Sequence, residues 1–144
     1  MIALIERACL PLIQKQDIKT VAAQAGLRKT RDAYVLQLEG VQKITLTPPT
    51  VANPDVCTLT VNHDVDQAPS FVDALSAWTA SRNPPIPPLG ARYQISPNVF
   101  GWSWSLDTGT VREGVAFTAQ KQADGRPVGK AYDVSVLLFS HSGG

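Results

Sequence analysis

The first part of the chain carries apolar side chains at the spacing of an α-helix. They recur three or four residues apart, at Ile2, Ile5, Cys9 and Leu12. This spacing predicts a helix over residues 2–14 with Cys9 on its buried side. A second, shorter helix is predicted between Asp17 and Gly26, because aspartate is a good N-cap and glycine readily adopts the left-handed conformation that ends a helix.

After this helix, apolar and polar residues alternate, which is typical of half-buried β-strands. The alternating segments are 33–40, 41–47 and 55–63 in the first half and 91–96, 99–108, 110–121 and 130–140 in the second. A helix that begins at Ser70, with Phe71, Leu75 and Trp78 on its apolar side, is expected between the two sets. The proline-rich segment 83–90 ends it and is expected to be a stiff connector, with a polyproline ligand for an aromatic groove as the alternative.

The two halves of the chain have similar patterns. Residues 34–47 correspond to 102–118, and residues 57–61 correspond to 132–136. The similarity indicates an α-β-β-β unit that occurs twice, with 91–96 as an added strand. We therefore predict an α+β fold with one antiparallel sheet and helices packed on one face, in a single domain over residues 1–144.

The segment 99–108 places two tryptophans on one side of a strand. By alternation, Trp102 and Trp104 share a face with Phe100 and Leu106. We expect this face to pack against the helices, because each buried tryptophan removes about 150–250 Å² from water. The alternative is a cleft in which one indole remains accessible and stacks on a ligand.

The last strand carries apolar residues on both faces. Val134, Val136 and Leu138 are expected to face the helices. That assignment leaves Leu137 and Phe139 on the opposite side, as an apolar patch of the kind that marks an interaction site. These two residues are therefore candidates for the centre of an interface with a protein partner or of a weak homodimer.

Composition and charge exclude several classes of partner. The 144 residues carry a net charge of +1, so no long-range field would attract nucleic acid. No apolar run approaches the roughly 20 residues of a membrane-spanning helix. The sequence therefore indicates no nucleic-acid partner and no membrane span.

Candidate catalytic groups are few. The segment "GWSWS" is not a nucleophile elbow, because Ser105 stands where the second glycine is needed. A Cys–His nucleophile is disfavoured because both cysteines are expected to point inward. His63, Asp64 and Asp66 lie in one loop, but they match no zinc or calcium spacing and are expected to be turn and capping residues. We assign no catalytic residue, no metal site and no cofactor.

The two cysteines are expected to face the same core. Cys57 shares a strand face with Leu59 and Val61, and Cys9 lies on the apolar side of the first helix. A bridge between them would close a loop of about 49 residues and stabilise the fold by roughly 4 kcal/mol on the chain-entropy model. Two buried free thiols are the alternative. We expect the disulfide and, with it, an exported, periplasmic protein.

Five segments together resemble a known group of proteins. They are "IERACLPLI", "NPDVCTLTV", "ALSAW", "WSWS" and "QKQADGRPVGKAYDVSVLLFS". The chain resembles the small exported proteins that are common in alphaproteobacteria and have no established activity. The resemblance covers nearly the whole chain and implies a periplasmic compartment and a disulfide. Such proteins usually begin with a signal peptide, and residues 1–5 are too short for one, so we expect that peptide to lie outside this sequence.

These observations favour a binding or association module without catalytic activity. The alternative is a small-molecule-binding or hydrolytic cleft between the sheet and the proline-rich segment. The candidate residues for such a cleft are Trp102 and Trp104 as stacking surfaces and His63, Asp64 or Arg92 as polar groups. A polar pocket beside an accessible indole would favour ligand binding, whereas a flat apolar sheet face would favour association.

Overall fold

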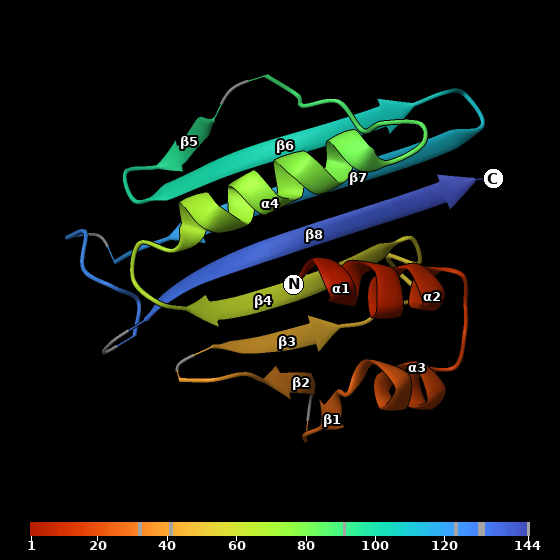
Figure 1. Ribbon diagram of the computed structural model, residues 1–144, viewed down its shortest axis with the longest axis horizontal. Coiled ribbons are helices and arrows are strands. Elements are labelled where there is room, and N and C mark those ends of the chain that lie inside the picture. The colour runs from red at the N-terminus through yellow and green to blue at the C-terminus, as the bar shows by residue number, and fades with distance from the viewer. Residues whose placement is uncertain (32, 41, 91, 123, 130–131, 144) are drawn as a thin grey trace.

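An eight-stranded antiparallel sheet runs through the molecule in the order β1-β2-β3-β4-β8-β7-β6-β5 (Figure 1). The computed structural model describes residues 1–31, 33–40, 42–90, 92–122, 124–129 and 132–143. The strands are β1 (Arg28–Lys29), β2 (Tyr34–Gln37), β3 (Lys43–Thr47), β4 (Val56–His63), β5 (Tyr93–Ser96), β6 (Val99–Asp107), β7 (Val111–Gln120) and β8 (Asp133–Gly143). The helices are α1 (Ile2–Leu4), the π-helical turn η1 (Ile5–Cys9), α2 (Leu10–Ile13), α3 (Ile18–Ala25) and α4 (Ala68–Ser81).

The first predicted helix is present as three consecutive helical pieces. Pro11 lies in the first turn of α2, where its missing N–H interrupts the α-helical hydrogen bonding. The wider π turn η1 precedes it, with the Leu10 N–H bonded to the Ile5 carbonyl. The limits of α3 are as predicted. The Asp17 carboxylate accepts the Thr20 N–H at 3.0 Å, and Gly26 adopts the left-handed conformation with φ of 73°.

The two halves of the chain form the two halves of the sheet. Each half contains helical segments and four consecutive antiparallel strands, and the halves meet where β4 pairs with β8. The predicted α+β fold with an antiparallel sheet is therefore confirmed. In each half a short strand, β1 or β5, pairs antiparallel with the next strand along the chain.

One face of the sheet carries the core. Cys57 on β4 lies beside Phe139 on β8, which in turn lies beside Val115 on β7, and all three are buried. The predicted disulfide is confirmed: Cys9 and Cys57 are bonded, with their Cα atoms 5.4 Å apart, so the bridge joins η1 to this face. Helix α4 packs on the same face, where Trp78 meets Phe139 with ring centroids 6.0 Å apart. Figure 1 shows α1, α2 and α4 in front of the sheet.

The expected orientation of the last strand is wrong. Leu137 and Phe139 are completely buried against the helices, so they cannot form the centre of an exposed interface. Leu138 lies on the opposite face and is 43% exposed. The register decides this orientation, because Phe139 pairs with Cys57, whose side chain must face η1 to reach Cys9.

The proline-rich segment lies along the edge of β6. The Leu89 N–H donates to the Ser103 carbonyl at 2.8 Å, and the Ser105 N–H donates to the Pro87 carbonyl at 2.9 Å. Ile86 is buried within the core. The segment thus covers backbone groups of the part of β6 that β5 does not pair with, which would otherwise be open to pairing with another chain.

Candidate ligand-binding pocket

A pocket of about 210 Å³ lies at one end of the sheet, beside the first turn of α4. It is bounded by the end of β4, the start of β8, the end of β7 and the first half of β6. The lining residues are His63, Asp66, Ala68, Pro69, Arg92, Asn98, Phe100, Trp102, Ala119, Gln120, Lys121 and Asp133. The pocket therefore combines an aromatic wall with charged groups of both signs.

Residues of β6 form the aromatic wall. Trp102 is partly exposed and packs beside Phe117 of β7, with ring centroids 6.1 Å apart. Phe100 lies on the same side of β6, and the Arg92 guanidinium stacks over its ring at 4.4 Å from the centroid. Such an arrangement holds an arginine by a cation–π contact while its N–H donors remain free to bind.

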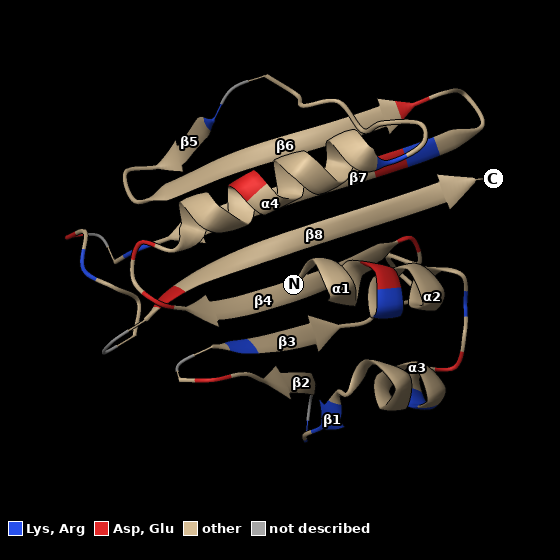
Figure 2. Ribbon diagram, in the orientation of Figure 1, with Lys and Arg blue, Asp and Glu red and all other residues tan. Residues whose placement is uncertain are grey.

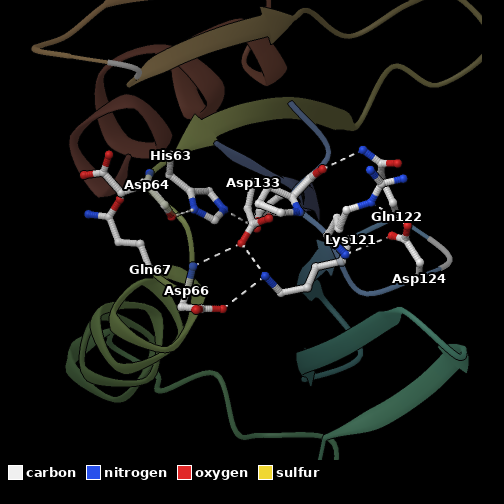
Figure 3. Close-up of polar contacts among 11 residues, drawn as sticks. His63, Asp64, Asp66, Gln67, Lys121, Gln122, Asp124 and Asp133 are labelled. Carbon is white, nitrogen blue, oxygen red and sulfur yellow. Dashed lines mark hydrogen bonds and ion pairs between the residues drawn. The ribbon is translucent and has the colours of Figure 1, made fainter. Parts of the chain in front are cut away.

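The most constrained polar group of the pocket is the Asp133 carboxylate. Asp133 is only 4% exposed, and its Oδ2 accepts the Lys121 ammonium at 2.9 Å and the Asp66 N–H at 3.0 Å (Figure 3). Its Oδ1 is also buried, yet it has no hydrogen-bond partner among the described residues. Buried polar atoms are rarely left unpaired, so this oxygen has hydrogen-bonding capacity that the described residues do not use.

Lys121 ties the two carboxylates of the pocket together. Its Nζ lies 2.9 Å from Asp133 Oδ2 and 3.1 Å from Asp66 Oδ1. The hydrogen bond to Asp133 raises the pKa of Lys121, and the hydrogen bond to Asp66 adds to this effect. Partial burial acts in the opposite direction but does not cancel it. Burial raises the pKa of Asp133, but the hydrogen bonds from Lys121 and from the Asp66 N–H, together with the lysine charge, hold it below its usual range. Both groups are therefore charged at neutral pH.

His63 is fixed on both sides of its ring. Nδ1 donates to the Asp64 carbonyl at 2.8 Å, because a carbonyl can only accept. In the neutral ring, Nε2 then accepts the Ser135 hydroxyl at 2.8 Å. Ser135 is completely buried and does not line the pocket. The distance between His63 and Ser135 is that of a base and a serine nucleophile. The pair is not a catalytic one, because a ligand in the pocket would not reach the serine oxygen.

The structure brings together some of the predicted site residues and separates others. Trp102, His63 and Arg92 line the same pocket. Asp64 is exposed and does not line the pocket. Its backbone N–H donates to the Gln67 side chain at 3.2 Å. Trp104 is buried, beside a cleft of about 370 Å³ against the proline-rich segment, where the sequence had placed the ligand site.

Sequence reasoning missed the residues that give the pocket its charge. Asp133 opens β8 and Lys121 follows β7, so both stand at the ends of strands that are otherwise mostly apolar. A charged residue at the border of an apolar strand was the available signal. It could not identify a site, because most such residues are simply solvated.

A second polar cluster lies at the opposite end of the sheet and has a structural explanation. Glu113 is buried and receives the Arg82 guanidinium at 2.6 Å and His141 Nδ1 at 2.9 Å. Arg82 also stacks over Trp78, at 5.2 Å from the ring centroid. The cluster therefore joins the end of α4 to β7 and β8. Within the described ranges, no three histidine, cysteine or acidic residues are grouped so that they could hold a metal ion.

Comparisons with protein-family models, with curated proteins and with solved structures give no match for this chain. Among the helices that the structure describes, none has the length and apolar character needed to cross a membrane.

We expect Asp133→Asn to lower the free energy of unfolding by about 1–3 kcal/mol at pH 7, because it weakens a buried charged hydrogen bond. The pKa of Asp133 is lower in the folded protein than the 3.8 of an unperturbed aspartate. The charged Asp133 carboxylate therefore contributes its full stabilisation at pH values above 3.8. This contribution is lost as the pH falls through the lower pKa that Asp133 has in the folded protein. Urea unfolding from pH 7 to pH 2 should show the gap between parent and variant closing in acid.

The control for this experiment is Asp73→Asn, at an exposed position of α4. It should leave the stability at pH 7 within about 0.5 kcal/mol of the parent. A constant gap between the parent and Asp133→Asn over the whole pH range would contradict the assignment of a lowered pKa to Asp133.

Proposed function

We propose that the protein binds a small organic ligand in the pocket beside α4 and performs no covalent chemistry on it. The observation that carries the proposal is the buried, unpartnered Oδ1 of Asp133 in a pocket walled by the partly exposed Trp102. A buried acceptor without a donor is destabilising by about 1–3 kcal/mol. A ligand that donates to this oxygen would offset that energy.

The walls of the pocket favour a planar or apolar ligand body. Trp102 offers a flat face for stacking, and Phe100, Ala119 and Pro69 add apolar surface. The volume of about 210 Å³ is below the 300–1,000 Å³ of drug-sized sites. The ligand is therefore a molecule with one ring or one short apolar chain and a hydrogen-bond donor.

The arrangement around His63 argues for binding without catalysis. Both of its ring nitrogens are engaged, with the Asp64 carbonyl and the Ser135 hydroxyl. A general base needs a nitrogen within hydrogen-bond reach of the reacting group. His63 instead positions the end of β4 and gives the pocket one aromatic edge.

An exported, periplasmic location is part of the proposal. The disulfide between Cys9 and Cys57 supports it, because such bonds form and persist in oxidising compartments. The test is the thiol content of protein isolated from periplasmic and cytoplasmic fractions of cells that express it. Two titratable thiols in the periplasmic material would contradict the proposed location.

Ligand binding can be tested with single-ring probes. We expect phenol, benzamide or benzylamine to cause a saturable change in tryptophan fluorescence, because Trp102 is at the pocket wall while Trp78 and Trp104 are buried. Trp102→Ala should weaken binding by roughly tenfold or more, through loss of the stacking surface. The control variant is Leu138→Ala, on the far face of the sheet. Equal binding by Trp102→Ala, or no saturation with any probe, would contradict the proposal.

A second candidate function is association through the open face of the sheet. This face carries Thr58, Thr60, Val136 and Leu138, and neither β4 nor β8 has a charged side chain on it. In Figure 2, β8 is free of charged residues beyond its first residue. The part of the face formed by β4 and β8 therefore creates no charge repulsion between two identical copies.

The size of the open face also suits a second copy of the chain. Strands β4, β8, β7 and β6 have 8, 11, 10 and 9 residues. At about 3.3 Å per residue and 4.8 Å between strands, they span on the order of 600 Å². Two copies would then bury roughly 1,200 Å², which exceeds the approximately 1,000 Å² of a stable interface.

We expect sedimentation equilibrium at increasing concentration to detect a dimer, and Leu138→Lys to abolish it without changing the circular dichroism spectrum. In the Leu138→Lys variant each copy would bury one lysine charge in the interface. Burying a charge without an opposite charge beside it is strongly unfavourable. Lys43→Met, on β3 and outside the four strands of the proposed interface, is the control and should leave the dimer intact. A parent protein that stays monomeric at high concentration would contradict this second function.

A further inference from the structure

The pocket holds two complementary groups that lack partners within the protein. One is Asp133 Oδ1, a buried acceptor without a donor among the described residues. The other is the Arg92 guanidinium, which stacks on Phe100 and has no carboxylate within ion-pair distance in the described part of the chain. Asp133 and Arg92 both line the pocket, so it holds one negative and one positive side chain with unused hydrogen-bonding capacity.

We propose that the ligand is a free amino acid with an apolar or aromatic side chain, whose ammonium donates to Asp133 and whose carboxylate binds Arg92. This inference rests on the proposed ligand-binding function and specifies its chemistry. The side chain of the ligand lies against Trp102 on β6.

The hydrogen-bonding capacity of each group fits this role. Lys121 and the Asp66 N–H occupy Oδ2 of Asp133, which leaves Oδ1 for one N–H of an ammonium. A guanidinium offers a fork of N–H donors that matches the two oxygens of a carboxylate. The stacking of Arg92 on Phe100 holds the plane of that fork, so little conformational entropy is lost on binding.

The overall charge of the pocket disfavours singly charged ligands. Asp66 and Asp133 carry two negative charges, and Lys121 and Arg92 carry two positive charges. The sum is zero, so an ion of either sign leaves a net charge in the occupied pocket. A zwitterion is neutral overall and satisfies both unpartnered groups, whereas an amine satisfies only Asp133 and an acid only Arg92.

The experiment is calorimetric titration of the full chain with four probes of the same size class. They are phenylalanine, N-acetylphenylalanine, phenylalaninamide and 2-phenylethanol. Acetylation removes the ammonium, amidation removes the carboxylate and the alcohol lacks both. Phenylalanine should bind roughly 10- to 100-fold more tightly than each of the others, because every one of them loses at least one charge-assisted hydrogen bond.

Two variants test which residue binds the carboxylate and which binds the ammonium of the ligand. Arg92→Gln, at an exposed position, should weaken phenylalanine roughly tenfold or more and leave phenylalaninamide almost unchanged. Asp133→Asn should weaken phenylalanine and leave N-acetylphenylalanine almost unchanged, with circular dichroism to verify folding. Arg112→Gln is the matched control, because Arg112 lies near the other end of β7 from the pocket and should have no effect.

Each outcome of this experiment decides the inference. Phenylalaninamide or N-acetylphenylalanine binding as tightly as phenylalanine would overturn it, since one of the two charged contacts would then be absent. If 2-phenylethanol binds as tightly as phenylalanine, and Trp102→Ala abolishes both, the zwitterion is wrong while the ligand pocket stands. If none of these probes and none of the single-ring probes binds, the inference and the proposed function both fail.

Discussion

Replacing Phe139 by alanine should lower the free energy of unfolding by about 3–5 kcal/mol. Phe139 is completely buried and contacts Trp78 of α4, so truncation leaves a cavity between the helix and the sheet. Leu138→Ala, one residue away on the open face, should change the stability by about 1 kcal/mol or less, because Leu138 already contacts solvent. Urea unfolding followed by circular dichroism measures both.

The comparison of these two neighbours tests the orientation of β8 directly. The variants remove similar apolar groups from adjacent positions of one strand, so a difference between them reports which face is covered. If Leu138→Ala destabilised the protein as much as Phe139→Ala, the open face would be buried in solution. That result would support association through this face.

Loss of the Cys9–Cys57 disulfide should lower the free energy of unfolding by about 4 kcal/mol, within a range of 2–5 kcal/mol. The two cysteines are 48 residues apart, and the bond restricts this long loop in the unfolded chain. It also joins η1 to β4 at the centre of the sheet. Guanidinium unfolding of the Cys9→Ala/Cys57→Ala double variant, compared with the parent, measures the effect.

The accompanying thiol measurement controls for the redox state. Denatured, unreduced parent protein should contain no titratable thiol, since Cys9 and Cys57 are the only two cysteines and are paired. Reduction of the parent should reproduce the instability of the double variant. A double variant as stable as the oxidised parent would mean that the bond makes no net contribution to folding.

The two tryptophans of β6 illustrate how far alternation can predict a site. Both face the helix side of the sheet, as expected from their spacing, yet Trp104 is 4% exposed and Trp102 is partly accessible. The difference arises from their neighbours in space. Ile86 and the proline-rich segment lie near Trp104, whereas the pocket adjoins Trp102. Periodicity identifies the face of a strand but carries no information on what covers each point of it.

The sequence by itself determined much of the local structure and predicted that the two cysteines face the same core, whereas the structure shows that they are bonded. The caps at Asp17 and Gly26 are local hydrogen-bonding and dihedral preferences, so they were readable without a fold. The inward orientation of Cys9 followed from the helical spacing of the apolar residues around it. That of Cys57 followed from the alternation of apolar and polar residues in its strand. The start of α4 was predicted two residues late, since Pro69 fits the first turn of a helix and carries no clear signal of its own.

Only the tertiary structure decided the orientation of β8 and the composition of the pocket. Residues 134–139 are apolar on both faces apart from Ser135, so a period of two is compatible with either orientation, and only the pairing of Phe139 with Cys57 selects one. The pocket takes His63, Trp102, Lys121 and Asp133 from four different strands or their ends. Their meeting depends on the order in which those strands assemble, a non-local property that no sequence window contains.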